Sequence, residues 1–396
     1  MYNQLVSIIT ADRIPFIEKK PSSCYEAMSG TETLFEQTIS YSHSNLPCMI
    51  NSYEVLIIDG QSRVKLKSIL KKNIGDSLLS ICLTKQGIIS YEINLKVIQL
   101  LHYSDVLLIY NLIQASECLS LTESWVPICL PGISDRGYLQ LYCNFFKVEG
   151  NIDVGLVYVT ESQSGDMFMS FSEQANSVIN SCIENNIIKV TANINNDNND
   201  SNINSGNITE SNSDIKKNIY SKLHNSYIYR RKKCSRSLNN SNEDYSNDDR
   251  LLEDFIHKLS YNFDKIETHK DIFDKVEYLI CRHKTLNQSF TVGFEDYDID
   301  LKKDEKYVKS VFYDLYNNYL NSNDKTFNIN NNSSSNHSYF VAELNRNISN
   351  YVSLIEADNY VIIASFSIFK DVEDIYATMN ELVKHIKIYI NQYFIL

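Results

Sequence analysis

Cysteine, histidine and serine are the residues of this chain that could bind a metal or act as nucleophiles, and their spacing favours neither role. Nine Cys are scattered along 396 residues without a Cys-x-x-Cys pair, and the eight His show no His-x-x-x-His spacing. This pattern fits reduced thiols better than a disulfide framework or a zinc site. Ser164-Gly165-Asp166 could form a nucleophile turn, but no paired His is evident, so we interpret it as a helix start. We predict no catalytic residue, no metal and no cofactor.

Composition narrows the class of protein further. Apolar residues make up 43% of the chain, enough for a folded core, and the net charge of −12 argues against a nucleic-acid-binding surface along the whole chain. With only 11 Gly, phosphate-binding loops are scarce. The N-terminus lacks the basic region and cleavage site of a secretory signal, and the longest apolar runs are about half the length that spans a bilayer. These features favour a cytoplasmic protein.

One stretch, ESWVPICLPGISDRG at residues 123–137, organises the interpretation of the rest. It holds the only Trp and two of the five Pro. Apolar segments flank a proline stop and a Gly-containing turn, which predicts two strands joined by a turn. Pro127 lacks an N–H donor, so its strand should lie at a sheet edge or carry a bulge. Trp125, Pro127 and Pro131 could contact another domain or a partner protein; core and turn packing is the alternative that we favour.

The apolar patterns around this stretch predict one order of elements twice: two strands, a helix, three strands and a helix. Helical spacing is clearest from Val372 to Ile390. Hairpins on both sides of a single helix make each sheet mainly antiparallel. The first series follows a helix at 62–72 and comprises strands 78–83 and 88–93, a helix 105–115 capped by Ser104, strands 125–130, 138–146 and 153–160, and a helix from 166. The second comprises strands 275–281 and 288–294, helix 304–320, strands 339–344, 351–356 and 360–366, and helix 371–392.

Two polar segments interrupt this order. Residues 191–250 are rich in Asn and Ser and cannot bury enough surface to offset the entropy of ordering, so we expect a disordered linker. Residues 321–338 form a similar Asn-rich insertion. The linker carries a basic cluster that could bind anionic lipid on an endosome, act as a nuclear signal or nucleic-acid patch, or be a solvated loop without a partner. The cluster consists of Arg230, Arg231, Lys232, Lys233 and Arg236.

The order of elements is that of the longin fold, and residues 123–146 resemble a particular longin family. ESWVPICLP, followed by a turn and an aromatic strand, is similar to the Trp-x-Pro-x-Cys-Leu-Pro segment of the Mon (SAND) family of vacuolar fusion proteins. In that family the segment lies in the second of three longin domains. Four more segments resemble the family in the same order: MYNQLVSIIT…GTETLFEQ (1–37), SLLSICLTKQGIISYEI (77–93), VGLVYVTES (154–162) and LVKHIKIYINQYFIL (382–396).

This resemblance implies the fold and the domains. We expect an α/β (α+β) protein of repeated longin domains, each a five-stranded, mainly antiparallel sheet flanked by helices. Residues 1–46 would be the C-terminal helices of a truncated first longin domain. Residues 53–190 would be the second longin domain, 191–250 the linker, and 251–396 the third longin domain.

The resemblance also implies a function without covalent chemistry. Mon-family proteins pair with a Ccz-type three-longin subunit, and the pair is the guanine-nucleotide exchange factor of a late-endosomal, Rab-seven-type GTPase. We therefore expect a non-enzymatic GTPase regulator in endosome maturation, autophagy and fusion with the vacuole or lysosome. It would be cytoplasmic and peripheral on the anionic, phosphoinositide-containing late-endosomal membrane, with no nucleic-acid partner. Because we expect the sheet of the first longin domain to be missing, the alternative is a longin scaffold or tether without exchange activity.

Overall fold

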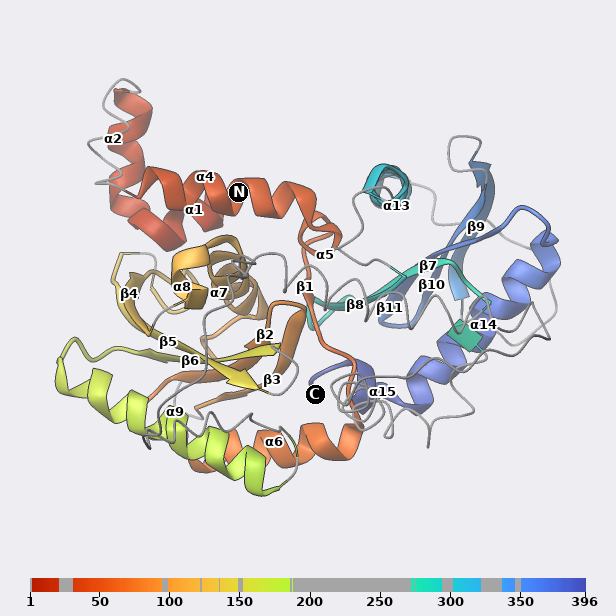
Figure 1. The fold of residues 1–396 in the computed structure, drawn as a ribbon. Helices are drawn as coiled ribbons and strands as arrows, with labels where there is room; N and C mark the ends of the chain where they lie inside the picture. Colours follow the sequence, from red (N-terminus) through yellow and green to blue (C-terminus); the bar gives the residue numbers. More distant parts are fainter. Residues whose placement is uncertain are drawn as a thin grey trace, which may run out of the picture.

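A computed structural model of the chain describes residues 2–20, 31–94, 99–121, 123–134, 136–148, 152–185, 187, 272–273, 275–293, 302–321, 337–345 and 350–396. The predicted linker at 191–250 with its basic cluster, and residues 322–336 of the predicted insertion, lie outside the described residues. The described elements form two sheets, each flanked by helices, that lie side by side (Figure 1).

The five-stranded sheet, on the left of Figure 1, is antiparallel throughout. Its order, β3-β2-β6-β5-β4, places the first strand of the opening hairpin beside the last strand of a three-stranded meander. The predicted series of two strands, a helix and three strands is confirmed for this sheet. Its strands are β2 (Leu79–Thr84), β3 (Gly87–Ile93), β4 (Ser124–Ile128), β5 (Leu139–Val148) and β6 (Ile152–Thr160).

Helices cover both faces of the five-stranded sheet. One face packs on α7 (Tyr103–Ala115) and α8 (Glu117–Leu121). The other face packs on α6 (Gly60–Lys72) and α9 (Asp166–Glu184), whose aromatic and aliphatic side chains form a second core. The sheet is therefore the middle layer of three, as layered packing of an apolar sheet requires.

The start of α7 differs from the prediction. Ser104 is not the cap, because the helix begins at Tyr103 after the N-cap residue His102. The backbone N–H of His102 donates to the carboxylate of Asp105 (3.0 Å), which satisfies a donor at the helix start. Asp105 thus sets the first turn of the helix.

The six-stranded sheet, on the right of Figure 1, repeats this topology in the order β8-β7-β11-β10-β9 and adds one strand, β1, beside β8. α13 (Lys302–Asn321) covers one face, and α14 (Val372–Ile388) covers the other. The prediction of one helix over 371–392 is wrong in its last turn, because α14 ends before Tyr389 and a short helix, α15 (Ile390–Tyr393), follows. The ring of Tyr393 stacks on that of Phe290, with 4.7 Å between the ring centroids. The strands are β7 (Tyr278–His283), β8 (Gln288–Val292), β9 (His337–Asn345), β10 (Asn350–Ala357) and β11 (Tyr360–Ser367).

Strand β1 (Tyr53–Glu54) corrects the expectation of five strands for this sheet. It pairs with β8 in parallel, and the next residue, Val55, bridges in parallel to Ile88 of β3. The N–H of Leu56 donates to the carbonyl of Ile88 (2.9 Å). The segment 53–56, which opens the predicted second longin domain, therefore lies between the edges of both sheets. The predicted domain boundaries stay predictions.

The N-terminal helices pack on both sheets. α1 (Tyr2–Ile9) and α4 (Glu32–Ser44) lie over α7, whereas α5 (Leu46–Met49) reaches α13. Pro15 stands in the first turn of α2 (Ile14–Lys19), where a missing N–H is tolerated, so the helix runs through this residue. The origin of these N-terminal helices in a first longin domain stays a prediction.

We predict that acid destabilises the six-stranded sheet through His283. The centroid of its buried ring lies 5.1 Å from that of Tyr360 and 5.3 Å from that of Phe394. Its Nδ1 accepts a hydrogen bond from the N–H of Leu286 (3.4 Å). Burial, with the charges of Arg282 and Lys284, lowers the pKa of His283 below 6.5. The unfolded chain therefore takes up this proton first, and the free energy of unfolding should fall as pH drops below about 6.5.

The measurement is urea unfolding at a series of pH values between about 7 and 5. The variant His283→Gln should lose less stability on acidification than the unsubstituted chain. His43→Gln, which changes an exposed residue of α4, is the control and should keep the original pH dependence. Equal pH dependence in all three proteins would contradict the assignment to His283.

Candidate functional site

The described residues contain no grouping typical of covalent or metal chemistry. No cluster of three or more His, Cys, Asp or Glu in this part of the chain could hold a metal ion. Six of the seven described cysteines are buried, and burial raises the pKa of Cys143 and Cys182 to about 12, so these thiols stay protonated. Cys118 is exposed. None of the described helices is both long and apolar enough to cross a bilayer.

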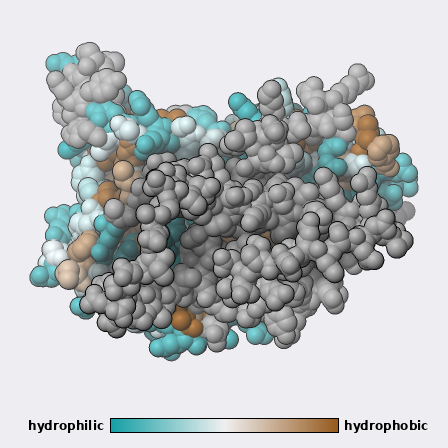
Figure 2. Space-filling model, viewed as in Figure 1, coloured by the Kyte–Doolittle hydropathy of each residue, from teal (hydrophilic) through white to brown (hydrophobic). Residues whose placement is uncertain are grey.

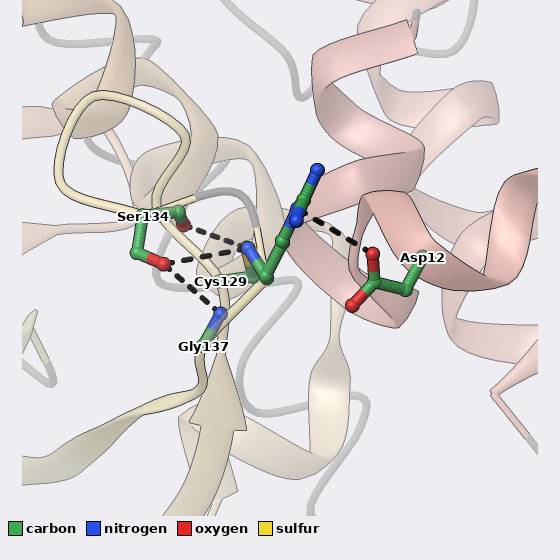
Figure 3. A network of polar contacts seen from close by, with 5 residues as sticks. Asp12, Cys129, Ser134 and Gly137 are labelled. Carbon is green, nitrogen blue, oxygen red and sulfur yellow. Dashed lines mark hydrogen bonds and ion pairs between the residues drawn. The ribbon is translucent and has the colours of Figure 1, made fainter.

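The turn within residues 123–137 is held by its own polar side chains. The thiol of Cys129 donates to the carbonyl of Ser134 (3.0 Å), and the hydroxyl of Ser134 accepts from the N–H of Gly137 (3.0 Å) (Figure 3). The backbone N–H of Cys129 donates to the carbonyl of Ser7 in α1 (2.9 Å). This turn therefore fixes the first N-terminal helix to the edge of the five-stranded sheet.

An exposed ion pair adds to the same contact. Arg136 Nε lies 3.6 Å from the carboxylate of Asp12, which faces the turn in Figure 3. Both side chains are more than half exposed, so water screens the attraction and the pair contributes less than about 1 kcal/mol. The backbone contact at Cys129, rather than this pair, secures the helix.

Gly132 allows the turn to approach α7. Its N–H donates to the carboxylate of Asp105 (3.2 Å), which also holds the start of α7, and burial raises the pKa of that carboxyl. A Cβ at position 132 would lie 2.1 Å from Asp105 Oδ2 and 3.0 Å from the carbonyl of Leu100. Only glycine fits here without moving the helix or the turn.

The three residues named as possible contacts differ in their burial. Trp125 is half-buried and packs on Phe168 and Phe171 of α9, with 6.2 and 6.1 Å between the ring centroids. Pro127 is exposed on β4, which is the edge strand of its sheet, so the edge prediction is confirmed. Pro131 is half-buried in the turn beyond the strand. Packing thus accounts for Trp125, and a partner contact at any of the three stays a prediction.

The junction between the sheets is a site that the sequence analysis missed. The side chain of Gln288 is fully buried, and its Nε2 donates to the carbonyl of Ile395 (3.0 Å) and to the hydroxyl of Tyr53 (3.1 Å). Its Oε1 accepts from the N–H of Ile395 (2.8 Å). One amide therefore joins β8, β1 and the C-terminal residues, and Figure 1 shows the C-terminus between the two sheets.

Arg63 of α6 holds the other side of this junction. It is 4% exposed and donates to the carbonyls of Leu56 (2.6 Å), Asn391 (3.0 Å) and Gln392 (3.0 Å), and also to that of Ile89. Burial lowers the pKa of the guanidinium to about 9, and the side chain is charged at neutral pH. A sequence signal existed, because Arg63 stands in the apolar stripe of α6 at helical spacing from Leu66. Gln288, inside a short strand, carries no such signal.

Comparison with known proteins identifies the fold. A family model described as the second longin domain of FUZ, MON1 and HPS1 matches residues 96–180, which include the Trp125–Pro131 motif. Two plant relatives are both named vacuolar fusion protein MON1 homolog. The relative from Oryza sativa subsp. japonica is 29% identical over 149 residues, which are 37% of this chain and 26% of the relative. The relative from Arabidopsis thaliana is 26% identical over 148 residues, which are 37% of this chain and 24% of the relative. Vacuolar fusion protein MON1 homolog A from Gallus gallus is 24% identical over 160 residues, which are 40% of this chain and 29% of the relative.

Two sheets of the same topology define a protein of repeated longin domains, and strands β4, β5 and β6 of the five-stranded sheet lie within the matched region. The aligned part spans about a quarter of the length of the curated relatives. The match to the second longin domain and the shared motif make the chain similar to the vacuolar-fusion branch of this class, the Mon family.

We predict that Gly132→Ala destabilises the chain by about 1–3 kcal/mol, because the added methyl displaces the Asp105 carboxylate or the turn. The matched control is Gly165→Ala, at a position where a Cβ meets nothing within 4 Å and the backbone is helical. The control should change the free energy of unfolding by less than about 0.5 kcal/mol. Equal effects of the two substitutions in urea unfolding would show that Gly132 is not constrained by Asp105.

We predict a larger defect when the junction amide is removed. Gln288→Ala leaves the N–H and C=O of Ile395 and the hydroxyl of Tyr53 without this partner in a buried site, which should cost about 2–3 kcal/mol. Gln86→Ala, in the exposed β2–β3 turn, serves as the control and should be nearly neutral. Limited proteolysis should also cleave after residue 390 faster in Gln288→Ala alone; equal cleavage of both variants would argue against the junction.

Proposed function

We propose that this chain is one subunit of a heterodimeric guanine-nucleotide exchange factor for a Rab-family GTPase, acting in membrane traffic to the vacuole or lysosome. The observation that carries the proposal is the second-longin-domain match at residues 96–180, shared with relatives named as vacuolar fusion proteins. The tandem repetition of the longin topology supports it. The cognate GTPase would be of the late-endosomal, Rab-seven type.

The structure suits this activity because exchange breaks no covalent bond. An exchange factor binds the nucleotide-free GTPase more tightly than the nucleotide-bound form. The bound exchange protein therefore weakens nucleotide binding to the GTPase as much as the bound nucleotide weakens binding of the exchange protein. A shift of about 10⁴-fold corresponds to about 5.5 kcal/mol of differential binding, which one interface can supply. Buried thiols and the lack of a metal-ligand cluster among the described residues are compatible with such a binding function.

The proposed partners are a Ccz-type three-longin subunit, the GTPase and an anionic, phosphoinositide-containing membrane. The protein would work on the cytoplasmic side of late endosomes or the vacuole as a peripheral protein. Support for the subunit comes from the family alone. The basic cluster Arg230, Arg231, Lys232, Lys233 and Arg236 is the proposed lipid contact and lies outside the described residues.

One observation favours a second candidate function, a longin scaffold without exchange activity. Helix α1 packs on α7 and β4, and helix α4 packs on α7; within the described residues neither helix has a sheet of its own. In the Mon family the first longin domains of both subunits form the GTPase-binding face. A scaffold would hold partner surfaces together without accelerating nucleotide exchange.

Co-expression with the Ccz-type subunit separates the two candidates. The exchange proposal expects a stable heterodimer that accelerates release of fluorescently labelled GDP from the Rab-seven-type GTPase, with little effect on a secretory Rab as the control. A stable heterodimer without accelerated release would support the scaffold. No heterodimer at micromolar concentrations would contradict both.

A further inference from the structure

The two outer edges of the paired sheets differ in how they are protected. Within the described residues, β4 pairs only with β5, and β9 pairs only with β10. β4 is five residues long and contains Pro127, which blocks addition of another strand. β9 is nine residues long, HSYFVAELN, and contains neither Pro nor Lys, the residues that commonly protect an edge. Among the described strands, β9 is therefore the edge available to a further strand.

A cavity borders this edge on the α13 side. It has a volume of about 300 Å³ and lies between α13 and the end of β9. Its apolar part comes from Tyr307, Val311 and Leu315, and its acidic part from Asp314 and Glu343. A strand added beside β9 would direct every second side chain toward this cavity.

Exposed apolar side chains lie at the end of the sheet where β9 ends and β11 leads into α14. Leu344 of β9 is 44% exposed. Its neighbour Asn345 pairs with Asn350 of β10, and Asn350 pairs with Ser367 at the end of β11. The next residues, Ile368 and Phe369, are 44% and 93% exposed, and Val372 is 46% exposed. Figure 2 shows apolar surface at this end of the molecule, where β11 leads into α14. Such a cluster beside an open edge marks an interaction surface.

Charge decides which partner fits. The exposed acidic residues around the edge and its corner outnumber the cations there, which are Lys306 and Lys370. The acidic residues are Asp314, Glu343, Asp371, Glu373 and Asp374. Two copies of this chain paired edge to edge would bring like charges together, and an anionic membrane would be repelled. A cationic segment would be attracted on both faces.

We propose that β9 binds an extended, cationic segment of a partner protein, which adds to the six-stranded sheet as a further strand. Main-chain hydrogen bonds to β9 supply affinity. Alternate side chains supply specificity: Lys or Arg faces Asp314 and Glu343 in the cavity, and apolar side chains cover Leu344 and Phe369. This inference is independent of the exchange activity proposed above.

A synthetic probe tests this proposal on the full chain. The probe is a fluorescein-labelled peptide about ten residues long that alternates Val or Phe with Lys or Thr. It should bind with a Kd in the micromolar range by fluorescence anisotropy and slow hydrogen exchange of the β9 amides but not of the β4 amides. N-methylation of its alternate amides should weaken binding at least about tenfold, since strand addition needs those donors.

Charge variants identify the site. Asp314→Lys/Glu343→Lys should weaken probe binding at least about tenfold and strengthen binding of the same peptide with Glu in place of Lys. The matched control, Glu173→Lys/Glu184→Lys on exposed positions of α9, has the same net charge and should bind like the unsubstituted chain. Leu344→Ser/Phe369→Ser should also weaken binding of the probe.

Three results would overturn the proposal. They are no saturable binding up to about 1 mM probe, equal loss in the α9 control, and unchanged exchange of the β9 amides in the presence of probe. Binding of the chain to phosphatidylcholine–phosphatidylserine vesicles that depends on Phe369, without probe binding, would replace it with a membrane contact.

Discussion

The segment 53–56 is the physical constraint on which the rest of the structure depends. Each longin sheet ends in a hairpin strand, β3 or β8, whose outer backbone groups need partners once they are buried. The N–H of Tyr53 donates to the carbonyl of Asn287, just before β8, and that of Val55 donates to the carbonyl of Ser289 in β8. The N–H of Leu56 donates to the carbonyl of Ile88 in β3. One short extended segment thus satisfies two sheet edges at once and fixes the two sheets in register.

The C-terminal residues reinforce the same joint from the other direction. Phe394 lies in the core of the six-stranded sheet, whereas Ile395 lies in the core of the five-stranded sheet. Gln288 and Arg63 satisfy the backbone groups that this crossing leaves buried. The two modules therefore behave as one body, which suits a protein whose proposed work is to hold partner surfaces at fixed positions and not to transform a substrate.

Helices and strands with a local sequence signal lie where the sequence predicts them. The helical stripe from Val372, the hairpins and the edge position of Pro127 follow from spacing and from the chemistry of single residues. The six-stranded count was missed because β1 is two residues long and is stabilised by β8, far away along the chain. Neither Gln288 nor the break at Tyr389 has a local cause, since both depend on Tyr393, Phe394 and Ile395 entering the cores. For the candidate site, residue type suggested Trp125 as a contact, but only the neighbouring α9 shows that packing accounts for it.

Hydrogen exchange at the amides of Tyr53, Val55 and Leu56 tests the one-body account most directly. The account predicts that these amides exchange as slowly as those of the central strands β6 and β11, because opening them requires the two sheets to separate. Exchange at the rate of the outer strand β4, with β6 and β11 still protected, would contradict it and show two longin modules that move independently.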